Sequence, residues 1–452
     1  MTYAIADDAG SPRLWIFTTI WLGQLISYTG SGLTNFALAV WAYQRTGSTT
    51  QMALISAFIV LPTVLLSPIA GAYVDRWDRR RALIFSDAGA GLSTFAIVLL
   101  LLNEHVQIWH VYVAVCASSI FGAFRWPALS ASTTQLVPEK QFGRASGLLQ
   151  VVQAGQVVIS PVLAGVLMDR IQLSGVILLD VVSFLFALAT LSIVHIPRPQ
   201  QTAAGTAGKG SILHEMVYGL TYISERAGLL ALLMFAFSVS LFIDMASLLV
   251  VPLVLVMSSS TVLGTALSLG GIGFLTGGAI MSAWGGPRRP IQGVVGFAMF
   301  AGMCITLIGF QSTTTAVTLC LFGVLTSLPL FYACNQTIWQ RKVAPDVQGR
   351  VFAIRRVIIL SSRLLASVAV GPLADRVFEP LLRVSGPLAS NVGVLVGVGP
   401  GRGIGLLFIV LGLLVGGISA AAAVSPRLRR IEDELSDAVG EAAATAQPIP
   451  AR

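Results

Sequence analysis

Three charged residues, Arg125, Asp244 and Arg363, lie deep within long apolar stretches of the sequence. A charge at the middle of a bilayer costs on the order of 3 kcal/mol, so each side chain should face an aqueous cavity or an opposite charge. Asp244 could bind a proton and release it as such a cavity opens to the two sides of a membrane in turn. We therefore predict these three residues as candidates for proton coupling.

The stretches that hold these charges have the length and composition of membrane-spanning helices. Apolar segments of about 20 residues recur from Leu14 to Val424. Of the 452 residues, 55% are hydrophobic and 11% are charged, whereas soluble domains carry roughly a quarter charged residues. Outer-membrane barrels have shorter segments of alternating hydrophobicity. The sequence therefore predicts an all-α polytopic membrane protein.

Turns and charged clusters divide the apolar sequence into twelve predicted transmembrane helices. Their expected ranges are 14–43, 50–74, 82–102, 107–136, 143–168, 174–195, 228–257, 261–284, 290–311, 314–341, 351–380 and 402–424. Basic residues are concentrated in the N-terminal segment, the C-terminal tail and the loops that join even-numbered to odd-numbered spans. Cytoplasmic loops are rich in Lys and Arg, so both termini are predicted to be cytoplasmic. The net charge of +8 is explained in this way without a nucleic acid partner.

Composition also divides the chain into halves. The segment PRPQQTAAGTAGKGS (197–211) is polar and rich in small residues, which is typical of a flexible connector. The next segment, ILHEMVYGLTYISER (212–226), is amphipathic and is predicted to lie on the cytoplasmic membrane surface. We predict four parts: an N-terminal six-helix bundle (1–196), a cytoplasmic linker with an amphipathic helix (197–227), a C-terminal six-helix bundle (228–425) and a cytoplasmic acidic tail (426–452).

An internal repeat supports this division. The segments GRASGLLQVVQAGQVVISPVLAGVLMDR, from Gly143, and GRVFAIRRVIILSSRLLASVAVGPLADR, from Gly349, both start with Gly-Arg and end with G-x-L-x-D-R. Repeats in membrane proteins are typical of duplicated bundles around a central pathway. The sequence therefore predicts two pseudo-symmetric bundles.

The loop between the second and third predicted spans concentrates charge in the stretch GAYVDRWDRRRAL (71–83). This stretch resembles the G-x-x-x-D-R-x-G-R-R-x-x-L signature of the major facilitator superfamily, with Asp78 in place of the internal glycine. The resemblance implies the major facilitator fold and a latch in which Asp75 meets the start of span eleven near Arg350. The simpler alternative is that the arginines only hold the topology. The latch residues that the resemblance implies are Gly71, Asp75, Arg76, Arg79 and Arg80.

A second signature lies in the fifth predicted span, where GQVVISPVLAG (155–165) resembles the g-x-x-x-G-P-x-x-G-G antiporter motif. Small residues allow helices to pack closely, and a proline bends a helix. The resemblance implies that span five faces the glycine-rich span eight, although ordinary close packing explains the same residues. The motif residues are Gly155, Ser160, Pro161, Ala164 and Gly165.

Other polar and aromatic residues fall on spans one, four and ten, which line the pathway in the fold that the chain resembles. Arg125 also lies where the drug/proton antiporters carry a proton-coupling arginine. Two other acidic residues, Asp87 and Asp180, lie closer to the ends of their spans and are expected to form local hydrogen bonds. Arg355 and Arg356 are expected to reach the cytoplasmic surface. The predicted substrate-cavity residues are Gln24, Asn35, Trp126, Tyr332, Asn335 and Gln336.

Several stretches, among them LPTVLLSPIAGAYVDRWDRRR and VGVGPGRGIGLLF, resemble the macrolide-efflux type of drug/proton antiporter. The resemblance implies a monomeric secondary exporter in a bacterial plasma membrane, which expels amphipathic compounds by alternating access. Its coupling ion would be the proton, with no cofactor. An endogenous siderophore, natural product or lysolipid is an alternative cargo.

Functions of another class have less support in the sequence. The four histidines are scattered near loops, and the four cysteines all lie inside apolar segments. Neither set has the spacing of a catalytic or metal-binding constellation, so an intramembrane enzyme is disfavoured and no metal is expected. A sensor would need a sizeable output domain outside the membrane, and no loop is long enough to form one.

Overall fold

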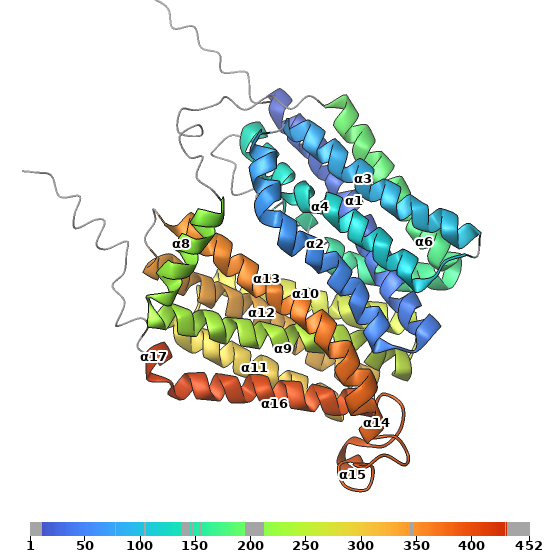
Figure 1. The fold of residues 1–452 in the computed structure, drawn as a ribbon, viewed down its shortest axis with the longest axis vertical. Helices are drawn as coiled ribbons and strands as arrows, with labels where there is room; N and C mark the ends of the chain where they lie inside the picture. Colours follow the sequence, from blue (N-terminus) through green and yellow to red (C-terminus); the bar gives the residue numbers. More distant parts are fainter. Residues whose placement is uncertain are drawn as a thin grey trace, which may run out of the picture. The chain divides into compact units, whose positions relative to one another are not determined.

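Helices form every regular element in the part of the chain that the computed structural model describes (Figure 1). This part comprises residues 11–76, 78–103, 105–137, 145, 148–149, 151–152, 155–194, 212–343, 347–429 and 431. The long helices are α1 (Ser11–Thr46), α2 (Thr49–Arg76), α3 (Arg79–Leu102), α4 (Ile108–Leu136), α6 (Ser160–Ile193), α9 (Ala227–Met257), α10 (Ser260–Trp284), α11 (Pro290–Phe310), α12 (Thr314–Lys342), α13 (Gln348–Pro372) and α16 (Arg402–Val424). The short elements are η2 (Gly155–Ile159), α8 (Ile212–Ser224), η3 (Leu373–Phe378), α14 (Glu379–Leu381), α15 (Gly393–Val396) and α17 (Pro426–Arg429).

Most of these helices can cross a bilayer. Within the described ranges, 10 helices are long and apolar enough to do so. They are all the long helices except α1, which is nevertheless helical over the whole of the first predicted span. The all-α polytopic prediction is therefore confirmed, and the count of twelve helices stays a prediction.

Helix α6 contains a break at Gln172. The backbone of this residue has φ 57° and ψ −178°, and φ is in the left-handed region that a glutamine rarely adopts. The break lies between the predicted end of span five and the predicted start of span six. Two helical stretches are thus joined within α6, one on each side of the kink.

The chain divides into two compact units. The first comprises Met1–Gly208 and Ser259–Ser268, and the second comprises Lys209–Ser258 and Leu269–Arg452. Helix α10 therefore begins in the first unit and continues in the second. The predicted bundle boundaries, and the acidic tail beyond α17, stay predictions.

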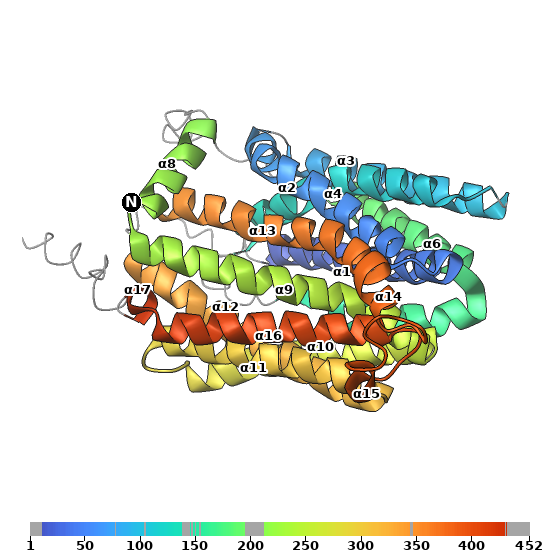
Figure 2. The same ribbon diagram turned by 60° about the horizontal axis from the view of Figure 1, so that its bottom comes forward.

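In the first unit, α1 packs along α6, α3 packs against both α4 and α6, and α2 packs against α4. Figure 2 shows the same helices from a second direction. A buried apolar cluster joins α1, α3, α4 and α6, and it includes Leu83, the last residue of the charged signature. The members with the least exposure are Ile20, Ala82, Leu83, Ala128, Leu129, Leu136, and Leu191.

In the second unit, α11 packs against α12 and α16, while α9 packs against α13 and α16. Helices α11 and α16 approach closely at Gly309, where a Cβ atom would lie 2.3 Å from the carbonyl oxygen of Gly405. Such contacts between small residues are typical of membrane helices. The predicted amphipathic segment forms α8, which packs against α9 and α13.

Candidate functional site

A buried ion pair lies in the interior of the first unit. Arg125 of α4 is 5% exposed and Asp87 of α3 is 0% exposed, and Arg125 Nε lies 2.8 Å from Asp87 Oδ1. Gln24 of α1 completes a triangle with them. Its Nε2 donates to Asp87 Oδ2 at 2.7 Å, and its Oε1 accepts from Arg125 Nε at 2.9 Å. Three helices are therefore connected by charged and amide groups in the core of this unit.

The rest of the Arg125 guanidinium is also in contact with protein. Its Nη2 donates to Ser27 Oγ. Its central carbon lies 4.1 Å from the centre of the Tyr28 ring and 5.4 Å from that of Phe184. Aromatic faces attract cations, and the attraction is stronger away from water. The positive charge of Arg125 is thus held in one place from several sides.

The sequence interpretation of Asp87 is corrected by this geometry. Asp87 was expected to form local hydrogen bonds near a span end, but it pairs with Arg125 and Gln24 on two other helices. An acidic residue inside the apolar stretch 82–102, next in order to a span with a central arginine, is the signal that points to such a pair.

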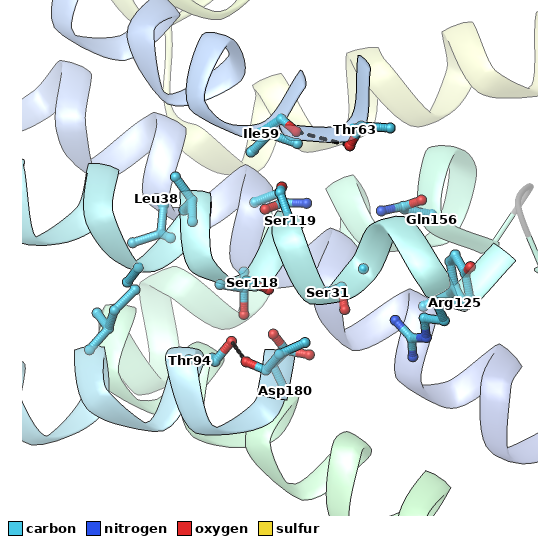
Figure 3. A pocket seen from close by; sticks show the side chains of 18 residues that line it. Ser31, Leu38, Ile59, Thr63, Thr94, Ser118, Ser119, Arg125, Gln156 and Asp180 are labelled. Atoms are coloured by element: carbon cyan, nitrogen blue, oxygen red, sulfur yellow. Dashed lines mark hydrogen bonds between the residues drawn. The ribbon is translucent and has the colours of Figure 1, made fainter. Parts of the chain in front are cut away.

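A polar cavity of about 180 Å³ adjoins this pair (Figure 3). Its walls come from α1, α2, α3, α4, η2 and α6, all within the first unit. Its volume can hold several water molecules, and water stays in a cavity where polar groups can bind it. The polar lining residues are Tyr28, Ser31, Thr34, Asn35, Thr63, Thr94, Ser118, Ser119, Arg125, Gln156 and Asp180.

The predicted cavity residues of the first unit occupy three different environments. Asn35 lines the cavity. Gln24 is 0% exposed and is bonded to the ion pair. Trp126 packs edge-on against Tyr28, with ring centres 6.5 Å apart. Of the three, Asn35 has the environment expected of a substrate contact.

The antiporter motif lies at the junction of η2 and α6, and it packs against α1. Gly155 belongs to η2, and Ser160 and Pro161 begin α6. Ser160 Oγ donates to the carbonyl oxygen of Thr29 at 2.8 Å. A Cβ on Gly32 would lie 2.4 Å from the same hydroxyl oxygen. Ser160, which is larger than the glycine usual at this position, therefore fits because α1 has a glycine opposite it.

The end of the motif contacts the first turns of α10, which belong to the same unit. A Cβ on Gly165 would lie 2.8 Å from the carbonyl oxygen of Ser260, and a Cβ on Gly264 would lie 2.4 Å from that of Pro161. Ala164, the remaining motif residue, is buried. One turn further along α6, Asp169 accepts hydrogen bonds from Ser260 Oγ, at 3.0 Å, and from Thr261 Oγ1. A carboxylate is favoured at this place, the N-terminus of a helix.

The second unit holds the other intramembrane acidic candidate. Asp244 of α9 accepts a hydrogen bond from Ser362 Oγ of α13 at 3.0 Å. The charge of Arg363, which is exposed, acts on Asp244, and Tyr332 of α12 lies within reach of both charges. Asp244 and Arg363, both predicted as proton-coupling candidates, therefore lie near each other in the second unit, and Tyr332, predicted as a substrate-cavity residue, lies near both.

The remaining predicted cavity residues lie one turn further along α12. Asn335 is buried, and its Oδ1 accepts from Trp339 Nε1 at 3.1 Å. Gln336 Oε1 accepts from Arg355 Nη1 of α13 at 2.7 Å, and the Arg355 guanidinium lies 5.0 Å from the centre of the Trp339 ring. Arg355 was expected to reach the cytoplasmic surface, but it is held inside the unit by these contacts.

The structure describes the side chains of only some residues of the charged signature (71–83). Gly71, Asp75 and Arg76 lie in the last turns of α2 and Arg350 lies in the first turn of α13, but their side chains lie outside the described part of the structure, so the latch stays a prediction. The arginines that follow are described, and they donate to helix ends. Arg79 Nη1 donates to the carbonyl oxygen of Ala131 in α4.

Arg80 and Asp78 complete this arrangement. Arg80 donates to the carbonyl oxygens of Leu191, at 2.7 Å, and Ser192, at 2.8 Å, in the last turn of α6. Asp78 accepts from the backbone N–H of Arg80 and of Arg81, so it caps the N-terminus of α3. The departure from the signature at this position is thus explained by a helix cap.

The Arg80→Leu variant should lower the free energy of unfolding by about 1–2 kcal/mol, since two carbonyl groups at a helix C-terminus lose a cationic donor. Denaturant titration of the purified protein in detergent micelles measures this change. Arg81→Leu is the matched control, because Arg81 is exposed and its side chain makes no hydrogen bond in the described structure. Equal losses in the two variants would contradict the capping role of Arg80.

The described residues contain no group of three or more His, Cys, Asp or Glu side chains placed to hold a metal ion.

Sequence comparisons place this arrangement among transporters. Residues 20–367 match the family model of the Major Facilitator Superfamily. Macrolide efflux protein A of Streptococcus pyogenes is 26% identical over 369 residues, which cover 80% of this chain and 90% of that protein. Multidrug efflux pump Tap of Mycolicibacterium fortuitum is 25% identical over 373 residues, which cover 79% of this chain and 88% of that protein.

Solved structures with the same fold are more distant in sequence. A bacterial homologue of the human lysosomal transporter Spinster, in an inward-facing and unoccupied conformation, has a TM-score of 0.70 and 12% identity over 91% of this chain and 96% of that chain. A bacterial homologue of the iron transporter ferroportin, in an inward-facing state, has a TM-score of 0.65 and 14% identity over 91% of this chain and 99% of that chain. At these identities the likeness supports the fold alone.

Proposed function

This chain belongs to the Major Facilitator Superfamily, and we propose that it exports amphipathic, drug-like compounds of the macrolide type in exchange for protons. The observation that carries the proposal is the similarity to Macrolide efflux protein A, which extends over 80% of this chain and 90% of that relative. The similarity to a multidrug efflux pump over 79% of the chain points to the same class of cargo.

The proposed mechanism is alternating access. A substrate would enter from the cytoplasmic side and leave on the other side, with proton entry supplying the free energy. The ionisable groups inside the two units, Arg125, Asp244 and Arg363, support proton coupling because charged residues in membrane spans mark proton and substrate pathways. The polar cavity of the first unit supports a water-accessible path to such groups.

The setting of this activity is also part of the proposal. We expect a monomer in the plasma membrane of a bacterium, in contact with lipid on all sides, with both termini in the cytoplasm. The proton is the coupling ion, and no further cofactor is proposed. The latch at Gly71, Asp75 and Arg76 belongs to the same mechanism, in which it would favour the outward-facing state.

Everted membrane vesicles that contain the protein test this function. Respiration acidifies the lumen of such vesicles, and an exporter then moves its substrate inward while protons leave. Adding a macrolide should therefore raise the lumenal pH, which a pH-sensitive dye in the lumen reports. Vesicles from cells without the protein are the control.

A panel of macrolides, cationic dyes and siderophores identifies the cargo class in the same assay. A response to macrolides is the expected result. A response to siderophores alone would replace the proposed cargo by the alternative one, and a panel with no response would contradict proton-coupled export of these compounds.

A further inference from the structure

The cavity of the first unit holds a second carboxylate, Asp180 of α6. This residue is 1% exposed and lines the cavity, as Figure 3 shows. Its Oδ1 accepts a hydrogen bond from Ser183 Oγ at 3.3 Å. Gly30 of α1 leaves room for the carboxylate, because a Cβ atom there would lie 2.7 Å from Asp180 Oδ1. The side chain is therefore buried, held in position and directed at a space that water can occupy.

The charged and titratable groups that face Asp180 come from three helices. Arg125 of α4 and Tyr28 of α1 line the same cavity, and Asp87 of α3 lies behind Arg125. The cavity residues of α2 and η2 are uncharged. Two carboxylates thus share one guanidinium, and that guanidinium forms its ion pair with Asp87 at 2.8 Å. Among the described residues no ion pair reaches Asp180.

This charge balance has a direct consequence. The Asp87–Arg125 pair is neutral as a unit, and its hydrogen bonds to Gln24 and Ser27 keep it closed. An ionised Asp180 adds one uncompensated negative charge to a buried site, which costs free energy unless a cation or water reaches it. A proton or a small cation that enters the cavity removes this cost. The cost returns when the cation leaves.

We propose that Asp180 is the residue that binds and releases the coupling proton, with the cavity of the first unit as its path to water. The inference rests on the proposed function, because it names the coupling residue of proton-driven export. In the step itself, a hydronium ion in the cavity gives a proton to a carboxylate oxygen of Asp180: one O–H bond of the hydronium breaks, a new O–H bond forms on the carboxyl group, and a water molecule is left in the cavity. Release reverses the step when the cavity is open to the other side.

The environment of Asp244 explains the choice between Asp180 and Asp244. Asp244 receives a hydrogen bond from Ser362 Oγ at 3.0 Å and experiences the positive charge of Arg363. Arg363 belongs to the neighbouring α13 and forms no ion pair with another acid among the described residues. No ion pair reaches Asp244 among the described residues either, but Asp244 is partly exposed and is not among the residues that line the cavity, whereas Asp180 is 1% exposed and lines it.

Proteoliposomes that contain the purified protein test the proposal with erythromycin as the macrolide probe. Two measurements are made in sodium-free buffer: exchange of labelled for unlabelled erythromycin without a pH gradient, and proton movement on addition of erythromycin. We expect Asp180→Asn to keep the exchange but to reduce proton movement at least about tenfold. Asp180→Glu should restore the movement, and Glu225→Gln, at a carboxylate whose side chain is 67% exposed, should change neither signal.

The outcomes separate this proposal from the proposed function. Absence of erythromycin exchange in the wild-type protein counts against the cargo and not against Asp180. Wild-type proton movement in Asp180→Asn would overturn the proposal. Loss of proton movement in Asp244→Asn alone would overturn it too, as would a signal that depends on sodium rather than on protons.

A second measurement, chemical labelling, uses the wild-type protein alone, so it requires neither a substrate nor a variant. Dicyclohexylcarbodiimide adds to protonated carboxyl groups in apolar surroundings, and mass spectrometry of peptides from the labelled wild-type protein identifies the site. We expect the label on Asp180, with less label as the pH of the buffer rises. A label on Asp244 with Asp180 unmodified would overturn the proposal.

Discussion

The Asp87→Leu variant should lose about 3–5 kcal/mol of its free energy of unfolding, because Arg125 would stay buried with no carboxylate beside it. Asp87 is 0% exposed; its Oδ1 forms the ion pair with Arg125 Nε at 2.8 Å, and its Oδ2 accepts a hydrogen bond from Gln24 Nε2 at 2.7 Å. Leucine has a similar size, so the loss of charge pairing dominates over the change in volume. Denaturant titration in mixed detergent micelles measures the difference from the wild-type protein.

The double variant Asp87→Leu/Arg125→Met separates the pair from the packing around it. Replacing both members of a buried ion pair by apolar side chains is often neutral or stabilising, so most of the loss should be recovered. A residual loss of about 1–3 kcal/mol is expected, because the buried amide of Gln24 loses both partners.

Glu225→Gln is the matched control for loss of a carboxylate in an ion pair. Glu225 lies 4.0 Å from Arg226, and the two side chains are 67% and 34% exposed. Exposed pairs contribute little, so the change should stay within about 0.5 kcal/mol. A double variant as unstable as Asp87→Leu alone would contradict the account of the pair as mutually compensating charges.

The pair illustrates which part of the site could be predicted from sequence. The depth of Arg125 within its span follows from hydropathy, and its need for a partner follows from the cost of a buried charge. The identity of the partner does not follow. These helices are apolar on nearly all sides, so they carry no polar face that would indicate which residues point toward a neighbour.

Because hydropathy gives the depth of a residue but not its neighbours, the sequence did not distinguish the environments of the other polar residues either. Gln24 and Asn35 are both amides on α1, and one supports the ion pair while the other lines the cavity. The local hydrogen bond expected of Asp180 is confirmed by Ser183 Oγ at 3.3 Å, but its place on the cavity wall did not follow from its position in the span. Spacing along a helix gives depth, but contact with a neighbour depends on rotation about the helix axis and on kinks.

The two sequence motifs predicted local contacts better than the single polar residues within the spans did, because each motif combines residue types whose physical roles depend on near neighbours. The small residues of 155–165 predicted close packing, and the contacts of Ser160 with Thr29 and of Gly165 with Ser260 are close. The sequence departs from the signature at Asp78 because this residue caps the N-terminus of α3, which begins at Arg79. A local rule such as capping could have predicted it.

The close contact at Gly264 leads to the second large prediction. Gly264→Ala should lower the free energy of unfolding by about 1–3 kcal/mol, because the added Cβ would lie 2.4 Å from the carbonyl oxygen of Pro161 and the backbones would have to separate. Separation would also lengthen the hydrogen bonds from Ser260 and Thr261 to Asp169. The measurement is again denaturant titration in detergent micelles.

Gly278→Ala is a control within the same helix. A Cβ on Gly278 would have nothing within 4 Å, so the substitution there changes only the backbone entropy and helix propensity. That change should stabilise the protein by about 0.4–1 kcal/mol. The two substitutions are chemically identical and lie in one helix, so opposite signs of the change isolate the contact with α6. A shift of the same sign and size in both variants would mean that α10 tolerates a methyl group at Gly264, and that the glycine there does not serve close packing against the antiporter motif.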